Sequence, residues 1–291
     1  MTATQENIND EFTKNPELKK KDLQELKCWL GTQMHLPSIS EEQLIVFLHS
    51  CYYDVARTKN CIETYYTLRT KTPEIFTNRD LKHPENQKML TVLNYIVLPV
   101  TDPNGNNVIF HSLKQTEPSK YSFADAARVY FMMIDWCIQH DGTSPGIVIV
   151  FDVTGLRFGH LTKLSLSLIH KILIYIQEGM PVRLKAIHIL NTIPIADQIM
   201  YLTKPFMNKE LQKLIHFHKR NDESIYEYLP KNSMPRDFGG ELPTVAELDA
   251  SYILKLHQLQ DYFKEEEKFC VDENKRSNIR KNKDNFVPLG H

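Results

Sequence analysis

The sequence predicts an α/β fold in which helices flank a mostly parallel β-sheet, preceded by a small all-helical unit. The segment "GIVIVFDVTG", residues 146–155, is a continuous run of β-branched and other apolar residues around one aspartate. Such a run is typical of a strand that is buried on both faces of a parallel sheet. From about residue 88 onward, strand-like and helix-like segments alternate, which favours parallel strands joined by helical crossovers.

The first part of the chain, from residue 18 to about residue 76, is predicted to be helical. Leucines recur there at helical spacing, as in "DLQELKCWL". Ser40 suits an N-cap because Gln43 follows it three positions later, and Pro73 is expected to end a third helix. We interpret this unit as a scaffold beside the main domain. The expected regions are 1–85 for the helical unit, 86–248 for the α/β domain and 249–291 for a final helix and tail.

The spacing of apolar residues changes after residue 88. Two short apolar runs flank "DPNG", residues 102–105, which indicates a hairpin. Residues 123–140 predict a helix, and residues 160–179 predict a long, mostly apolar helix. The segment "PVRLKAIHILN", residues 181–191, predicts a second buried strand that opens with two cations on one face.

The helix expected from Pro194 onward is apolar over more than the usual core-facing arc. Two neighbouring stripes run along this helix. The first contains Ile195, Ile199, Leu202 and Phe206, and the second contains Ala196, Met200, Thr203 and Met207. Asn208 is a candidate cap for the next helix, which we extend through "IHFH". A last helix is expected to reach about residue 269, with "KEEEKF" as a solvated face. The charged segment 272–286 is expected to be disordered.

Composition excludes several classes of protein. The net charge of -1 provides no general attraction for nucleic acid, and we expect no nucleic-acid partner. Neither a signal peptide nor a membrane-spanning stretch is expected. The five scattered cysteines contain no C-x-x-C motif, which is typical of unpaired thiols in a reducing compartment. We therefore expect a cytoplasmic monomer.

The motifs of common enzymes are missing from the sequence. It contains no P-loop, no G-x-S-x-G and no H-E-x-x-H. His216 and His218, two positions apart on an expected helix, would not converge on one metal. Asp152 ends a buried strand, where a turn cap is the favoured role and a general base is the alternative. We expect no catalytic residue, metal or cofactor. The apolar segments allow either a packed core or a lined pocket, and composition does not separate the two.

Five motifs follow one another in the second part of the chain. They are "DPNGNNVIF", "GIVIVFDVTGLRFGHL", "AIHILNTIP", "KPFMNKELQKLIHFH" and "MPRDFGG". In this order they resemble the opening hairpin, the central strand and turn, the strand end before a mobile helix, the segment after that helix and the closing motif of the CRAL-TRIO lipid-binding family. Residues 88–247 carry the resemblance, and residues 18–80 resemble the helical unit that precedes this domain. The chain looks most similar to the alpha-tocopherol transfer protein-like group, which includes retinaldehyde-binding relatives.

The resemblance implies a lipid held in a closed apolar cavity under a lid, the helix that begins at Pro194. It therefore favours a pocket over a packed core. The implied lipid-binding residues are Tyr130, Phe131, Ile134, Ile147, Ile149, Phe151, Ile172, Tyr175, Ile176, Val182, Leu184 and Ile187. Tyr130 offers a hydroxyl to an alcohol or aldehyde. The implied lid and membrane-contact residues are Phe158, Ile195, Ile199 and Leu202.

The resemblance also gives a role to the two cations at the start of the second strand. Arg183 and Lys185 match positions that help to grip a phosphoinositide headgroup, and converging cations suit a multiply charged phosphate. Two further basic positions match Glu210 and Leu214 here, and Lys209 and Lys213 lie one residue earlier as partial replacements.

The resemblance predicts a binding and transfer protein, not an enzyme. Its cargo would be a small tocopherol- or retinoid-like lipid, released at phosphoinositide-containing membranes to which the protein binds transiently. The alternative is a phosphoinositide-responsive membrane adaptor without transfer activity. A third hypothesis, an enzyme acting on a lipid, depends only on Asp152 and the histidines.

Overall fold

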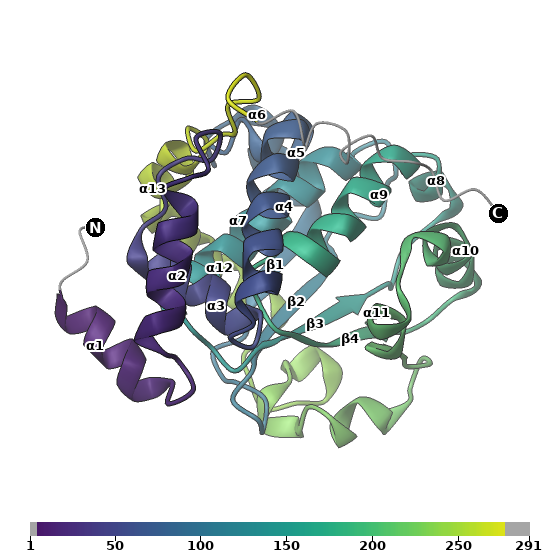
Figure 1. The fold of residues 1–291 in the computed structure, drawn as a ribbon. Coiled ribbons are helices and arrows are strands. Elements are labelled where there is room, and N and C mark those ends of the chain that lie inside the picture. Colours follow the sequence, from purple (N-terminus) through teal and green to yellow (C-terminus); the bar gives the residue numbers. More distant parts are fainter. Residues whose placement is uncertain (1–4, 277–291) are drawn as a thin grey trace.

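The computed structural model describes residues 5–276 (Figure 1). Its centre is a five-stranded sheet in the order β1-β2-β3-β4-β5. The first two strands are antiparallel and the other pairs are parallel, so the predicted mostly parallel sheet is confirmed. The strands are β1 (Leu93–Val97), β2 (Asn107–Leu113), β3 (Ile147–Asp152), β4 (Leu184–Leu190) and β5 (Ile215–Phe217).

Six helices precede the sheet in the described residues, and those between residues 18 and 76 are predicted by the helical spacing. The first and the sixth helix, residues 5–14 and 84–92, lie outside that prediction. Ser40 and Gln43 form the expected capping box at the start of the third helix. Asp54 caps the fourth helix through the backbone N–H of Arg57. The helices are α1 (Gln5–Lys14), α2 (Lys20–Leu30), α3 (Glu41–Ser50), α4 (Val55–Lys71), α5 (Pro73–Phe76) and α6 (Pro84–Val92).

Helices cover one face of the sheet, and short turns cover the other (Figure 1). The helical layer contains α7 (Phe123–Asp141) and α9 (Leu166–Ile174), and α9 continues as a π-helical turn, η1 (Tyr175–Gly179). The expected single helix over 160–179 is divided, because Ser165 caps α9 and leaves α8 (Phe158–Leu161) separate. The opposite layer contains η3 (Glu223–Glu227), η4 (Lys231–Ser233) and η5 (Arg236–Phe238).

Alternation along the strands divides the core between these two layers. Val148 and Val150 of β3 pack with the turn residues Leu229 and Met234. Ile147 and Ile149 point to the other side and join the core that includes α7 and the N-terminal helices. The predicted burial of β3 on both faces is therefore confirmed.

A buried network of four charges joins three regions of the chain. The Arg69 Nη1 of α4 lies 3.1 Å from the Asp135 Oδ2 of α7, and its Nη2 lies 2.9 Å from the Glu266 Oε2 of α13 (Gln260–Glu266). Arg79 pairs with both carboxylates, and Tyr65 donates to Glu266 at 2.8 Å. Glu266 is buried, so the prediction that all of "KEEEKF" forms a solvated face is wrong at this residue.

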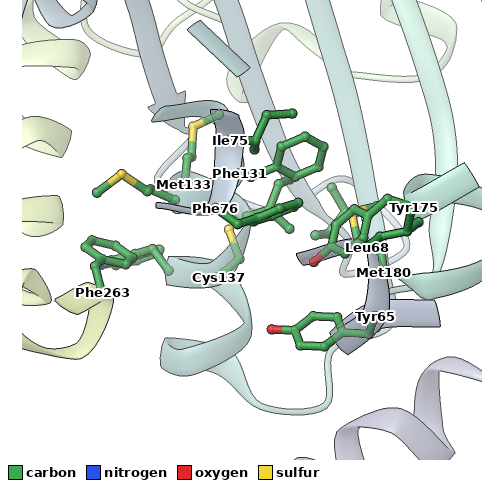
Figure 2. Close-up of a cluster of buried hydrophobic side chains, with 14 of the residues drawn as sticks. Tyr65, Leu68, Ile75, Phe76, Phe131, Met133, Cys137, Tyr175, Met180 and Phe263 are labelled. Atoms are coloured by element: carbon green, nitrogen blue, oxygen red, sulfur yellow. The ribbon is translucent and has the colours of Figure 1, made fainter. Parts of the chain in front are cut away.

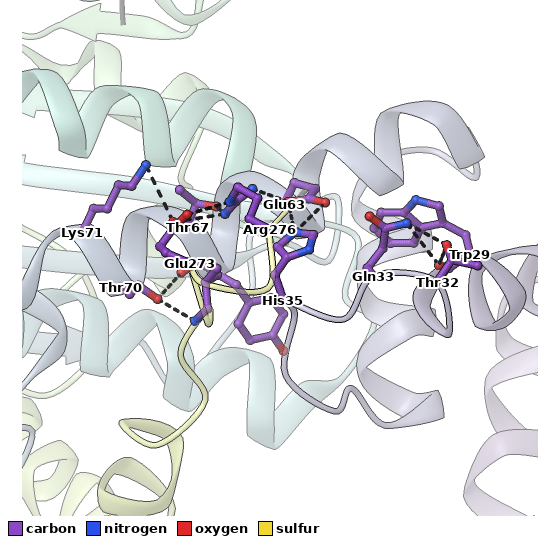
Figure 3. Close-up of polar contacts among 12 residues, drawn as sticks. Trp29, Thr32, Gln33, His35, Glu63, Thr67, Thr70, Lys71, Glu273 and Arg276 are labelled. Carbon is purple, nitrogen blue, oxygen red and sulfur yellow. Dashed lines mark hydrogen bonds and ion pairs between the residues drawn. The ribbon is translucent and has the colours of Figure 1, made fainter. Parts of the chain in front are cut away.

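The C-terminal part of the described chain also differs from its prediction. The expected single helix is two helices, α12 (Val245–Gln258) and α13, which meet at Leu259. Instead of being disordered from residue 272, the chain packs on α4 as far as Arg276 (Figure 3). The buried Arg276 guanidinium lies 3.1 Å from Glu63 Oε2 and donates to Thr67 Oγ1 at 2.7 Å. The rest of the expected tail, from residue 277, lies outside the described residues.

Candidate functional site

The expected lid is a helix, α10 (Pro194–Thr203), that packs beside α9 (Figure 1). It follows β4 through Asn191, whose φ of 54° turns the chain. Thr192 then donates its backbone N–H and its hydroxyl to the His218 carbonyl, at 3.0 and 3.1 Å. Pro194 occupies the first turn as expected. After α10 the chain makes the turn η2 (Lys204–Phe206).

The outer surface near α10 presents large apolar side chains. Phe158 is 66% exposed, and its role as a membrane contact stays a prediction. Ile195, Ile199 and Leu202 are only half-buried. Two residues that the sequence analysis missed are more exposed than these three: Tyr201 of α10 at 81% and Leu166 of α9 at 47%. Exposed apolar residues are common singly, and only their spatial grouping near α10 distinguishes these.

The twelve predicted lipid-binding residues divide into two groups. Seven keep accessible surface although they lie in or beside the sheet–helix interface, where close packing normally removes it. These half-buried residues are Tyr130, Phe151, Ile172, Ile176, Val182, Leu184 and Ile187. They come from α7, β3, α9, η1 and residues 182–187 in and just before β4, and all seven pack against the core on the helical side of the sheet. Together they form an apolar surface, and Ile176, Val182 and Leu184 of this surface also line a pocket of about 450 Å³.

The other five predicted lining residues are part of the packed core. Phe131, Ile134, Ile147, Ile149 and Tyr175 are buried. The Phe131 ring centroid lies 5.3 Å from that of Tyr175, and both rings contact Phe76 of α5 (Figure 2). These aromatic contacts join the N-terminal helices to α7 and η1. In this structure the five residues stabilise the wall behind the apolar surface.

Two polar groups lie within this apolar surface without hydrogen-bond partners among the described residues: the Tyr130 hydroxyl and the His111 Nδ1. The ring centroids of the two residues are 5.7 Å apart, and both rings contact Phe151. Burial lowers the pKa of His111 to about 4, while the Asn94 backbone opposes this change. Burial, with a smaller contribution from Cys137, raises the pKa of Tyr130. Both groups are therefore neutral near pH 7.

His111 was not among the predicted site residues. It stands in "VIFHSL" as a polar ring inside an apolar strand, on the same side of β2 as Ile109. Its position two residues from a core residue on a strand was the available signal. Buried polar groups in proteins nearly always have partners, so an unpaired pair within this apolar surface is a candidate for ligand recognition.

A second candidate site is a pocket of about 450 Å³ between the N-terminal helices and the start of β4. Arg183 lines it, and its Nε donates to the His49 carbonyl at 2.8 Å. The Arg183 guanidinium lies 4.3 Å from the Tyr52 ring centroid, and the Lys185 Nζ lies 5.6 Å from the same centroid. The two cations therefore do lie on one side of the strand. The Arg183 Nη2 is buried without a hydrogen-bond partner among the described residues.

The structure also brings a residue to this pocket that the sequence analysis missed. Arg57 of α4 lines the pocket and lies 5.9 Å from the Tyr52 ring centroid. Tyr52 and Tyr53 both have left-handed backbones, with φ of 55° and 62°, and this turn places Arg57 opposite β4. No local pattern signals this contact, because it depends on how two distant segments pack.

Not all of the predicted phosphate-binding lysines join Arg183. Lys209 and Lys213 of α11 (Lys209–Lys213) are exposed and do not line the pocket, and the Lys213 Nζ pairs with Glu210 at 2.8 Å. Glu210 itself lines the pocket together with Glu178, and their negative charges oppose an anion. Burial, followed by the charges of Arg183, Lys14 and Lys185, lowers the pKa of His49 beside the pocket to about 4.

The histidines are arranged differently from their prediction. Ile215–Phe217 forms strand β5 instead of continuing a helix, so His216 and His218 lie beside His188 of β4. The His188 Nδ1 lies 2.9 Å from the His218 Nε2, and the His218 Nδ1 lies 2.7 Å from the Ser224 hydroxyl. Across residues 5–276, no group of three or more His, Cys, Asp or Glu side chains is placed to hold a metal ion.

Asp152 has the structural role that the sequence favours. Its Oδ1 accepts hydrogen bonds from the Thr154 backbone and hydroxyl at 3.1 and 2.7 Å, and from the Asn191 side chain at 2.8 Å. It therefore caps the turn after β3 and ties it to the joint of α10. Within the described part of the chain, no helix combines the length and apolar composition needed to cross a bilayer.

Comparisons with known proteins agree with this arrangement. Residues 93–240 match the CRAL/TRIO domain, and residues 15–86 match the Pinta-like UBA domain. The chain is 30% identical over 269 residues to the mouse alpha-tocopherol transfer protein-like protein, covering 90% of this chain and 75% of that one. It is 22% identical to Clavesin-1 of Pongo abelii, covering 80% and 67%. The crystal structure of Sfh5 matches with a TM-score of 0.52 and 15% identity over 77% of this chain and 82% of that one, which supports the fold. The chain therefore belongs to the CRAL/TRIO family of lipid-binding and transfer proteins.

Proposed function

We propose that this protein is a cytoplasmic carrier that binds a small tocopherol- or retinoid-like lipid and releases it at membranes containing phosphoinositides. The observation that carries the proposal is the apolar surface of seven half-buried side chains on the helical side of the sheet. Side chains such as Phe151, Ile172 and Ile187 keep accessible surface inside the interface, where a folded chain normally buries it. A bound lipid would cover this surface and complete the packing.

The energy available from such burial is sufficient for a carrier. Covering about 400 Å² of apolar surface at ~25 cal/mol per Å² contributes on the order of 10 kcal/mol before the ordering costs are subtracted. The unpaired Tyr130 hydroxyl and His111 ring support a cargo with one polar end. A lipid hydroxyl can accept a hydrogen bond from Tyr130 and donate one to a lone pair of the neutral His111 ring.

Two features support release at a membrane. Phe158, Leu166 and Tyr201 are exposed near α10, which would place the lid against a bilayer. Arg183 carries an unpaired buried nitrogen beside the pocket of about 450 Å³, and Arg57 adds a second cation. Capture of a phosphoinositide headgroup there would draw the protein to the surface.

The test of the carrier is extraction of the purified protein with organic solvent followed by mass spectrometry, together with uptake of tocopherol or retinol from vesicles. We expect stoichiometric lipid by one of the two measurements. Failure of both would remove the carrier function.

A second candidate function, a phosphoinositide-responsive adaptor, depends on the unpaired Arg183 Nη2 alone. The double substitution Arg183→Ala with Lys185→Ala separates the two functions. A carrier keeps lipid uptake and loses release at phosphoinositide vesicles, whereas an adaptor loses its only activity. The matched control is Lys209→Ala with Lys213→Ala, which removes two exposed cations outside the pocket. If the Arg183 and Lys185 variant binds phosphoinositide vesicles like the unchanged protein, headgroup capture at this pocket is wrong.

A further inference from the structure

Three cations surround one aromatic ring at the pocket of about 450 Å³. The Arg183 Cζ lies 4.3 Å from the centroid of the Tyr52 ring. The Arg57 Cζ lies 5.9 Å and the Lys185 Nζ lies 5.6 Å from the same centroid, so all three are within the range of a cation–π contact. The Lys185 Nζ is also 3.5 Å from the Tyr52 hydroxyl. The proposed function uses these cations but gives no role to the ring between them.

The positive charge of this cluster is not balanced by the chain itself. Among residues 5–276, none of the three cations forms an ion pair with a carboxylate. Like charges gathered around one ring repel one another, and the negative face of the ring offsets that repulsion only in part. The Arg183 Nη2 is in addition buried without a hydrogen-bond partner among the described residues. The cluster therefore has unused capacity for a negatively charged ligand.

The backbone that holds the ring is strained. Tyr52 and Tyr53 follow each other with φ of 55° and 62°, and two successive bulky residues in the left-handed region are uncommon. Residues in such conformations are concentrated at functional sites and ligand clamps. Burial of the ring does not explain the strain, because Tyr52 is 54% exposed. The contacts that this conformation gives to Tyr52 are those with the three cations.

We propose that Tyr52 is a positioning residue that holds Arg57, Arg183 and Lys185 together as a binding site for a multiply phosphorylated anion. The membrane source of this anion, a phosphoinositide headgroup, rests on the proposed function, and a free inositol phosphate presents the same chemistry. A guanidinium can donate two parallel hydrogen bonds to a phosphate, and an ammonium binds it as a point charge. Because the ring already gathers the three side chains, binding requires less of their ordering.

The carboxylates of the pocket restrict which anions can bind. Glu178 and Glu210 line it from η1 and α11, and the Glu210 carboxylate pairs with the Lys213 Nζ at 2.8 Å. An anion with one charge gains little where both signs are present. An anion with several phosphates can contact all three cations around Tyr52 at once, which is why the site suits a multiply phosphorylated ligand.

The test compares Tyr52→Asn, which removes the ring and suits a left-handed backbone, with Tyr52→Phe, which keeps the ring. Calorimetry with inositol hexakisphosphate measures the free anion, and flotation with phosphatidylinositol bisphosphate vesicles measures the headgroup. Vesicles of phosphatidylserine with equal surface charge are the reference. We expect Tyr52→Asn to weaken binding of both probes about 10-fold and Tyr52→Phe to weaken it less than about 3-fold. Urea unfolding is expected to show Tyr52→Asn at least as stable as the unchanged protein, which a merely structural role of Tyr52 would not allow.

The matched control is Tyr53→Asn, because its backbone is also left-handed and, of the three cations, only Arg183 lies near its ring, at 5.7 Å. It is expected to weaken binding less than about 3-fold. The proposal is overturned if Tyr52→Asn binds both probes like the unchanged protein, or if Tyr52→Phe or Tyr53→Asn loses as much as Tyr52→Asn.

The two probes separate this proposal from headgroup capture at a membrane. Binding of inositol hexakisphosphate that depends on Tyr52, without binding to bisphosphate vesicles beyond the phosphatidylserine reference, refutes membrane capture and keeps the anion site. Binding to bisphosphate vesicles that is equal in Tyr52→Asn and the unchanged protein refutes the role of Tyr52 and keeps membrane capture. Absence of binding to either probe refutes both.

Discussion

Tyr130 and His111 each carry a buried hydrogen-bonding atom that the folded chain leaves without a partner among the described residues. An unmade buried hydrogen bond costs about 1–3 kcal/mol, so a sequence that keeps two of them around Phe151 has a reason outside folding. A polar end group on a bound lipid would satisfy both.

Substitution of Tyr130→Phe tests this interpretation. We expect the lipid-free protein to be as stable as the unchanged protein or up to about 1 kcal/mol more stable, because an unsatisfied hydroxyl is removed. The affinity for a lipid alcohol is expected to fall about 5-fold, and the affinity for its methyl ether is expected to fall less. Titration with both lipids and urea unfolding measure these effects.

The control is Tyr95→Phe, because the Tyr95 hydroxyl donates to the Ala126 carbonyl at 3.1 Å and so has a structural partner. It is expected to destabilise the protein by about 1 kcal/mol and to leave the preference for the alcohol unchanged. An equal loss of preference in both variants would assign the effect to packing.

Among the secondary-structure elements, α10 combines a half-buried inner side with a highly exposed tyrosine. Ala196 and Thr203 are buried on the inner side, Ile195, Ile199 and Leu202 are half-buried, and Tyr201 is 81% exposed. The proposed lid movement would expose both sides of this helix to a membrane surface, which requires apolar groups on both. The hydrogen bonds of Thr192 to the His218 carbonyl fix the start of the helix to the end of β5.

Substitution of Tyr201→Ala is expected to slow lipid transfer between vesicles about 10-fold, because burial of a large side chain at the membrane contributes about 1.5–3 kcal/mol. Lipid binding in solution is expected to stay unchanged. The matched control is Leu254→Ala, which removes a 68% exposed side chain on α12. Fluorescence transfer assays measure both variants, and equal slowing would show that Tyr201 has no special place in docking.

The sequence predicts the elements whose signals are local. The apolar run of β3, the "DPNG" hairpin and the Ser40 cap each depend on neighbouring residues, and each is confirmed. Strand β5 is missed because three residues after α11 resemble a continuing helix, and only pairing with β4 makes them a strand. Arg57 is missed for the same reason, since packing of distant segments gives it its surroundings.

At the scale of the whole molecule, the network of Arg69, Arg79, Asp135 and Glu266 unites the N-terminal helices, the α/β domain and the C-terminal helices. Two cations and two carboxylates balance each other in a dry interior. Burial is the largest influence on each group, and the partners' charges offset it. Burial of Glu266 in an acidic stretch was not predictable from its neighbours, because its partners lie almost two hundred residues away.

Removal of one member is expected to be far more costly than removal of an exposed neighbour. Glu266→Gln leaves a buried guanidinium undercompensated, and we expect it to lower the free energy of unfolding by about 3–5 kcal/mol. Glu265→Gln, one residue earlier, removes only an exposed pair with Lys268 and is expected to cost less than about 1 kcal/mol. Urea unfolding of both variants makes the comparison, and a loss below about 1 kcal/mol for Glu266→Gln would contradict a structural role for the network.

Acid is also expected to destabilise the whole molecule. Burial lowers the pKa of His49 and His111 to about 4 and that of His188 to about 3. An unfolded chain protonates these histidines near pH 6.5 and so binds more protons than the folded chain below that pH. The contribution of these neutral histidines to the free energy of unfolding is complete above pH 6.5 and is lost as the pH falls towards 4.

The measurement is the urea midpoint between pH 7.5 and 4. His188→Asn, which cannot titrate, is expected to flatten this dependence, whereas His140→Asn at an exposed position is expected to leave it unchanged. A midpoint that is constant over this range would be incompatible with neutral buried histidines.

The shared charge network limits how far the protein can be divided. A fragment of residues 93–240 would retain Asp135 but lose both arginines and Glu266. The Asp135 carboxylate would then be a buried charge without an ion-pair partner. In that fragment Asp135 would have to become protonated, or water would have to enter the interior and solvate it. The α/β domain therefore depends on the helices before and after it, because they supply the charges that compensate Asp135.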